Sequence, residues 1–142
     1  METLIQFFSE EVGYSLEDES LVRDWILNVI RSESLHAGVI NIIFCNDAYL
    51  LDLNQRFLER DTLTDVIAFD YREEGDEVSG DIFLSIERIR ENARSLGIPA
   101  SLEVHRVIIH GILHLCGYRD SHAGEKAEMR SKEDKYLSLL TS

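Results

Sequence analysis

The 142-residue sequence is poor in positive charge, cysteine and proline, and these shortages narrow what the protein can be. It has 14 lysines and arginines against 27 aspartates and glutamates, a formal net charge of −13, which disfavours non-specific adhesion to nucleic acid or to an anionic membrane. If a nucleic acid is the substrate, its binding must rest on a local basic patch or on a bound metal ion. With 44% hydrophobic residues, one proline, no repeat and no low-complexity run, the composition is that of an ordinary globular protein.

The sequence also lacks any apolar run of the roughly 20 residues that a membrane-spanning helix requires. Its first residues, Met1 to Ile5, do not have the basic-then-apolar pattern of a secretory signal. Cys45 and Cys116 are isolated within apolar runs, which is typical of buried free thiols in a reducing compartment rather than of a disulfide. We therefore expect a cytoplasmic protein without membrane contact, and the length predicts one domain over residues 1–142.

The spacing of apolar residues predicts a small α+β fold. Apolar and β-branched runs predict four strands, near residues 4–8, 39–45, 66–70 and 80–85. Helical spacing predicts five helices, near residues 20–30, 47–57, 86–96, 101–115 and 122–140. The last two strands are expected to pair as an antiparallel hairpin, and this order of elements is typical of a small mixed sheet with helices packed on it. The fourth helix is apolar nearly all round, so we expect it in the middle of the fold.

The most informative stretch lies in that fourth helix, where His110 and His114 are four residues apart. On a helix this spacing stacks the two imidazoles on one face, one turn apart, where they can share a cation. Gly117 favours the left-handed conformation that ends many helices, so the chain can turn there and bring Asp120 back towards the pair. Two imidazoles and a carboxylate leave a tetrahedral ion one free position, as in catalytic rather than structural sites.

The spacing His-x-x-x-His-x-x-Gly-x-x-His/Asp also occurs in zinc peptidases, in which a glutamate follows the first histidine and serves as general base. Gly111 occupies that position here. The pattern therefore predicts a zincin-like metal motif but disfavours proteolysis by that mechanism, and another metal-dependent hydrolase stays open as an alternative. Because sites of this kind accept zinc, nickel, iron or manganese, the ligand set does not fix the metal.

Three blocks of sequence resemble the YbeY family of bacterial rRNA maturation factors: Thr-Asp-Val-Ile-Ala-Phe at 64–69, Gly-Asp-Ile at 80–82 and His-Gly-Ile-Leu-His-Leu-Cys-Gly-Tyr at 110–118. The likeness runs roughly from residue 39 to residue 133. It implies a metal-dependent, single-strand-specific endoribonuclease with one zinc ion per chain and no organic cofactor. It further implies a role in processing the 3′ end of 16S rRNA and in ribosome quality control, with the small ribosomal subunit as partner, and a His-bearing helix at the base of a cleft.

Two positions depart from the family's pattern. The family usually has a third histidine where this chain has Asp120, and His122 is the alternative third ligand, although Asp120 keeps the spacing and a carboxylate is a competent zinc ligand. The family generally has an arginine, implicated in contacting RNA, at the position of Leu58. Three other arginines are candidates to contact RNA phosphates: Arg56, Arg60 and Arg119.

Because no glutamate follows His110, a general base would come from elsewhere or a metal hydroxide would itself attack. Three carboxylates are candidates for a direct catalytic role, each with a structural role as the alternative: Glu103, Asp65 and Asp81. Glu103 lies on the face of His110, two helical turns away, and the two aspartates lie at strand ends that can form the rim of a cleft. Tyr118 and Glu125 are candidates to orient a metal ligand.

The acidic net charge and the apolar Leu58 also leave a non-catalytic role open. In that case the protein would be a metal-containing ribosome assembly factor, which binds metal but does not cleave RNA.

Overall fold

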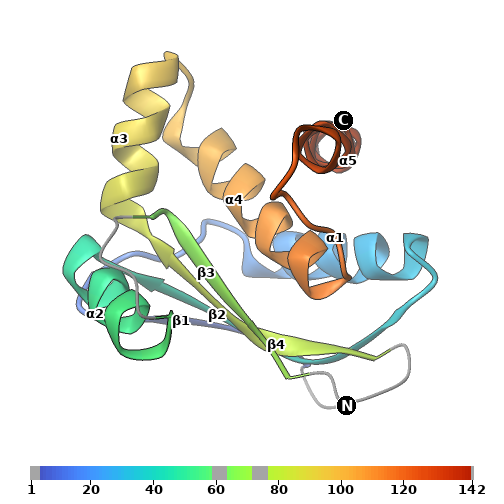
Figure 1. Ribbon diagram of the computed structural model, residues 1–142, viewed down its shortest axis with the longest axis horizontal. Coiled ribbons are helices and arrows are strands. Elements are labelled where there is room, and N and C mark those ends of the chain that lie inside the picture. The colour runs from blue at the N-terminus through green and yellow to red at the C-terminus, as the bar shows by residue number, and fades with distance from the viewer. Residues whose placement is uncertain (1–3, 59–63, 72–76, 142) are drawn as a thin grey trace.

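The computed structural model describes residues 4–58, 64–71 and 77–141, and the predicted α+β class is confirmed (Figure 1). The strands are β1 (Ile5–Ser9), β2 (His36–Cys45), β3 (Val66–Asp70) and β4 (Glu77–Ser85). The helices are α1 (Glu19–Ser32), α2 (Asp47–Leu58), α3 (Ile86–Leu96), α4 (Ala100–Leu115) and α5 (Ala123–Thr141). Element order and type agree with the prediction from apolar spacing.

The four strands form one mixed sheet in the order β1-β2-β4-β3. β1 and β4 both run parallel to β2, whereas β3 runs antiparallel to β4, so the predicted hairpin is confirmed. β3 therefore lies at an edge of this sheet, and its first residue, Val66, is paired with Leu84 near the end of β4.

Two apolar clusters lie on the two faces of the sheet. The larger one joins the sheet to α1, α3, α4 and α5, and the smaller one, built on Cys45, Leu50 and Ile67, lies beneath α2. Figure 1 shows α2 on one side of the sheet and α1, α4 and α5 on the other. In the described ranges no helix is by itself long and apolar enough to span a bilayer, although α3 and α4, bent by 118° to one another, pass that test as a pair.

α4 is the central helix, and its position is set by a close approach to the sheet. A Cβ atom at Gly111 would lie 2.8 Å from Cγ2 of Ile82 in β4, so glycine allows the helix to pack directly on the strand. Because Gly111 faces the sheet, the neighbouring His110 and His114 lie on the open side of α4, where their side chains are 22% and 31% exposed.

The end of α4 reverses the chain as its sequence predicts. Gly117 has a φ of 110°, in the region that favours glycine. Its N–H donates to the carbonyl of His114 and the N–H of Tyr118 donates to the carbonyl of Leu113, both at 3.0 Å. These two bonds form a Schellman motif, which satisfies the last carbonyls of the helix and turns the chain back towards the face that carries the histidines.

Candidate metal centre

Three ligand atoms meet on the open face of α4. Nε2 of His110 lies 3.1 Å from Nε2 of His114, and Oδ2 of Asp120 lies 3.3 Å from the first and 3.4 Å from the second. Ligand atoms held about 2.0–2.1 Å from a tetrahedral zinc ion are about 3.3–3.4 Å from one another. The three atoms therefore fit one face of such a coordination shell. No other group of three His, Cys, Asp or Glu residues in the described part of the chain brings its ligand atoms within 4.8 Å of one another.

Asp120, not His122, is the side chain that the structure brings to the two histidines. His122 instead lies directly before α5, where its carbonyl accepts from the N–H of Lys126 at 2.8 Å. Glu125 accepts from the N–H groups of Ser121 and His122, both at 3.2 Å, and so caps the N-terminus of α5. Glu125 thus fixes the turn after Asp120 rather than contacting a ligand side chain.

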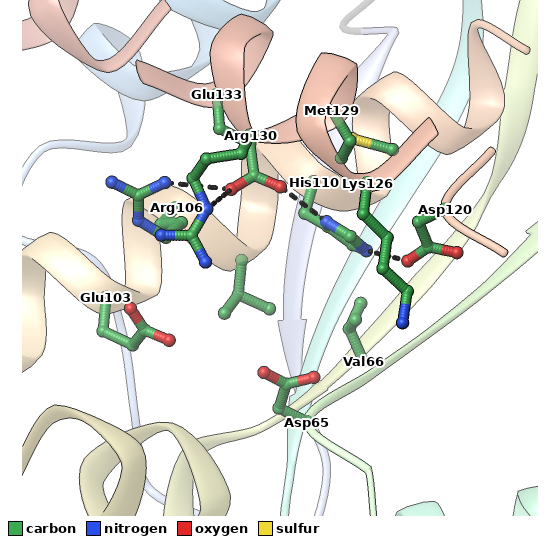
Figure 2. Close-up of a pocket in the computed structure, with 11 residues that line it drawn as sticks. Asp65, Val66, Glu103, Arg106, His110, Asp120, Lys126, Met129, Arg130 and Glu133 are labelled. Atoms are coloured by element: carbon green, nitrogen blue, oxygen red, sulfur yellow. Dashed lines mark hydrogen bonds and ion pairs between the residues drawn. The ribbon is translucent and has the colours of Figure 1, made fainter. Parts of the chain in front are cut away.

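Glu133 of α5 holds His110 from the side opposite Asp120 (Figure 2). Its Oε2 lies 2.7 Å from Nδ1 of His110, and because a carboxylate only accepts, Nδ1 carries the proton and Nε2 offers its lone pair to a cation. Arg106 donates to Oε1 of the same carboxylate at 2.9 Å. The sequence analysis missed Glu133, whose side chain is 6% exposed.

The pKa values of the two histidines are shifted in opposite directions. Burial lowers the pKa of His110, but the hydrogen bond and the charge of Glu133 outweigh burial and raise it above the ordinary value. Burial and the neighbouring His110 lower the pKa of His114. Burial raises the pKa of Glu133, but the hydrogen bonds from His110 and Arg106 outweigh it and lower the pKa. A cation competes with a proton at His110 and meets a neutral imidazole at His114.

Two cavities adjoin the cluster, and four residues line both of them: Asp65, Val66, His110 and Asp120. The α5 cavity, about 270 Å³, extends between α4 and α5 towards Glu103 (Figure 2). The β3 cavity, about 690 Å³, follows β3 towards Asp70 and reaches Leu58 at the end of α2. The candidate centre therefore lies in a depression that continues on both sides of it.

Two of the three candidate catalytic carboxylates line these cavities. Asp65, just before β3, lines both, and Glu103 lines the α5 cavity. Burial raises the pKa of Asp65 above the ordinary value. The structure does not bring Asp81 to the centre, because Asn41 Nδ2 and the hydroxyl of Tyr71 donate to its two carboxylate oxygens at 3.0 and 3.1 Å.

Two of the three candidate arginines, Arg56 and Arg119, lie away from the two cavities. Arg56 pairs with Asp52 at 3.2 Å on the exposed side of α2, and Arg119 lines a separate cavity beyond the end of α4. Arg60 lies outside the described residues. The basic side chains that line the α5 cavity are instead Arg106, Lys126 and Arg130. A sequence signal for two of them exists, since positions 126, 130 and 133 are spaced to share one face of α5.

Tyr118 contacts the cluster through its backbone, which hydrogen-bonds to the side chain of His114. Its hydroxyl donates to Oε1 of Glu33 at 2.6 Å, and Glu33 also accepts from Lys132 at 3.4 Å and from the hydroxyl of Tyr136. Glu33 therefore joins the end of α1 to the turn after α4 and to α5. Tyr118 thus fixes the turn that carries Asp120.

The fold and the site together define a class: a small α+β protein in which a central helix presents an open, three-ligand candidate metal centre within a surface depression. A family model described as endoribonuclease YbeY matches residues 5–141. The chain belongs to the endoribonuclease YbeY family, and the resemblance found in its motifs is confirmed.

Individual relatives agree with that assignment. The endoribonuclease YbeY of Flavobacterium psychrophilum is 50% identical over 94% of this chain and 94% of its own length. That of Cytophaga hutchinsonii is 43% identical over 97% of this chain and 96% of its own length. The solution structure of TM1509 from Thermotoga maritima superimposes with a TM-score of 0.68 at 29% identity, covering 96% of this chain and 88% of that one.

Proposed function

We propose that this chain is a zinc-dependent endoribonuclease that cleaves single-stranded RNA, matures the 3′ end of 16S rRNA on the small ribosomal subunit and acts in ribosome quality control. The observation that carries the proposal is the position of the ligand cluster. Its residues His110 and Asp120 line both the α5 cavity and the β3 cavity. An endonuclease must accommodate its substrate on both sides of the scissile bond, and a depression that continues past the reacting groups in two directions suits that task.

The residues of the cluster and of the two cavities would each have a distinct role in this chemistry. His110, His114 and Asp120 would hold the ion, which when bound supplies Lewis-acid polarisation of a phosphodiester oxygen and lowers the pKa of water. Glu133 orients His110. Asp65 is the carboxylate that lines both cavities, and its raised pKa, due first to burial, brings it closer to the neutral range in which a general base works best.

The packing of Gly111 argues against a peptidase. A peptidase with this histidine spacing carries its general base at that position. Here the position faces Ile82 of β4, and a side chain would point into the sheet rather than into either cavity. The proton acceptor therefore has to come from outside α4's histidine motif, which favours Asp65.

The proposal is tested with purified protein on matched single-stranded and duplex RNA, with and without a chelator, and after zinc is restored. We expect cleavage of the single strand only, its loss with chelator and its return with zinc. His114→Ala should abolish cleavage, whereas His36→Ala, at an exposed position on β2, should not. Equal cleavage by His114→Ala would point to a contaminating nuclease and overturn the proposal. Bound metal without cleavage of any RNA would favour the non-catalytic assembly factor.

A further inference from the structure

The α5 cavity holds a buried carboxyl group that the proposed chemistry does not use. Glu103 is 6% exposed, and its Oε1 atom has no hydrogen-bond partner among the described residues. A buried polar atom without a partner destabilises a fold, so such atoms are uncommon away from binding sites. Figure 2 shows the carboxyl group directed into the cavity, on the side where Asp65 lies. Glu103 is therefore placed to bind a group that enters this cavity.

The position of Glu103 along α4 argues against direct proton transfer between its carboxyl group and the ligand cluster. Glu103 lies seven residues before His110 on α4, and at 1.5 Å per residue that is about 10 Å along the helix axis. A general base has to come within about 3 Å of the proton that it takes. A nucleotide adjacent to a phosphate bound at the cluster can cover that distance, because its base projects sideways from the backbone.

The lining of the α5 cavity suits a flat, polar ligand. Its volume of about 270 Å³ is just below the range for small-molecule pockets, which begins at roughly 300 Å³. Val107 and Met129 supply apolar surface for the faces of a ring, and Glu103 supplies oxygen acceptors at its edge. Arg106 is already held by Glu133 and by Asp134, so it is not the group that reads the ligand.

Carboxylate oxygens only accept hydrogen bonds, so they distinguish nucleobases by the N–H donors that each base presents. Guanine presents two adjacent N–H donors, N1 and N2, which can bond to both oxygens of one carboxylate, whereas uracil presents a single N–H between two carbonyl oxygens. Single-stranded RNA is read in this way, by hydrogen bonds to the Watson–Crick edges of splayed-out bases. Burial and the charge of Asp65 raise the pKa of Glu103. Two N–H donors would offset both effects by stabilising the ionised carboxylate.

We propose that the α5 cavity binds one unpaired base of the RNA strand next to the scissile phosphate, that Glu103 reads its donor edge, and that guanine is preferred. Lys126 and Arg130, exposed residues that line the same cavity from α5, would contact the phosphate of that nucleotide. The inference rests on the proposed nuclease function and adds a specificity site to it.

The test compares oligouridylate octamers that carry one central guanosine, cytidine, adenosine or uridine. We expect kcat/KM for cleavage beside guanosine to exceed that beside uridine by about tenfold or more, since a good bidentate contact discriminates by roughly 1–3 kcal/mol. Glu103→Gln, which replaces one acceptor by a donor at nearly unchanged shape, should reduce this ratio to about two or less. Glu91→Gln, at an exposed glutamate of α3, should leave the ratio unchanged. Equal cleavage of the four RNAs by the unmodified protein, or a ratio that persists in Glu103→Gln, would overturn the inference.

A binding measurement separates this inference from the nuclease proposal. Calorimetric titration with guanosine and uridine 5′-monophosphates, on zinc-loaded protein, should show tighter binding of the guanosine nucleotide. Glu103→Gln should weaken that preference by about tenfold and Glu91→Gln should not, with circular dichroism confirming that each variant is folded. Preferential binding without RNA cleavage would retain the base site and remove the nuclease. Cleavage of RNA without any binding preference would retain the nuclease and remove the base site.

Discussion

Oε2 of Glu133 lies 2.7 Å from Nδ1 of His110, and Oε1 of the same carboxylate accepts from Arg106 at 2.9 Å. One acidic side chain of α5 thus joins two residues of α4 that are four positions, about one helical turn, apart. The orientation of a candidate metal ligand is therefore set by the packing of the last helix on the central one.

Glu133→Gln should weaken metal binding. The amide oxygen can still accept from His110, but it brings no negative charge, and its NH₂ group faces Arg106 in place of an acceptor. Loss of such a partner usually costs 10- to 100-fold in metal affinity, which competition with a chromophoric chelator would measure. Glu128→Gln, at an exposed position on the same helix, is the matched control and should bind as tightly as the unmodified chain. Unchanged affinity in Glu133→Gln would show that its contact with His110 does not tune the site.

Separate substitutions of Asp120 and His122 test which of the two is the third metal ligand. Asp120→Ala should reduce zinc affinity by at least tenfold, because it removes an oxygen 3.3 and 3.4 Å from the two imidazole nitrogens. His122→Ala should leave affinity within about twofold, since this residue lies directly before α5 and is not part of the cluster. Asp120→His should restore binding, because imidazole is an equally competent ligand. The reverse order of the two alanine variants would make His122 the ligand.

The spatial cluster of His110, His114 and Asp120 could be predicted because its members are close in sequence. Helical periodicity alone places His110 and His114 on one face, and a glycine at position 117 is a recognisable turn signal. Glu133 could not be predicted in the same way, since its approach depends on how α5 rotates about its axis when Met129 and Tyr136 become buried.

Asp81 is the opposite case, since the sequence suggested it for the site and the structure does not bring it to the candidate centre. Its place in a Gly-Asp motif near a strand end suggested the rim of a cleft, but sheet register decides its surroundings. β2 runs parallel to β4 with Asn41 directly beside Asp81, so the carboxylate is bonded within the sheet. Which strands are neighbours follows from long-range pairing, which local sequence patterns do not contain.

Gly111→Ala should destabilise the fold. The added Cβ would lie 2.8 Å from Cγ2 of Ile82, so α4 or β4 has to shift, and overpacking of this kind costs about 1–3 kcal/mol. Urea unfolding of metal-free protein measures the change. Gly124→Ala is the control, because nothing lies within 4 Å of the added atom and alanine favours a helix by up to about 1 kcal/mol. Equal stability of the Gly111→Ala variant and the unmodified chain would mean that the helix and the strand can separate at no cost.

Glu33→Gln should destabilise the fold in a way that depends on pH. Burial raises the pKa of Glu33, but the hydrogen bonds from Tyr118 and Tyr136, with the charge of Lys132, outweigh it and lower the pKa below the ordinary 4.5. The ionised carboxylate therefore stabilises the fold fully above pH 4.5, and that contribution is lost as the pH falls through the lowered value. At pH 7 the substitution should cost about 2 kcal/mol, as expected for hydrogen bonds to a charged group.

Urea unfolding of the two metal-free proteins at several pH values tests the direction in which the contribution of Glu33 changes with pH. The difference in unfolding free energy between the unmodified chain and Glu33→Gln should be constant from pH 7 to about pH 5 and should narrow towards pH 3. A difference that widened on acidification would contradict the lowered pKa.

RNA affinity should depend on Lys126 and Arg130 more than on the arginines that the sequence suggested. In a chain of net charge −13, the basic residues that line a cavity beside the centre have to supply the phosphate contacts. Alanine at either position should weaken binding of all single-stranded RNAs alike and reduce the slope of log affinity against log salt by about 0.7, the value for one phosphate contact. Fluorescence anisotropy with labelled RNA at several salt concentrations measures that slope. Arg56→Ala and Arg119→Ala make the same change of charge outside both cavities and should leave it unchanged. If these two variants lower the slope instead, the strand runs over α2 or the turn after α4, and the α5 cavity is not its path.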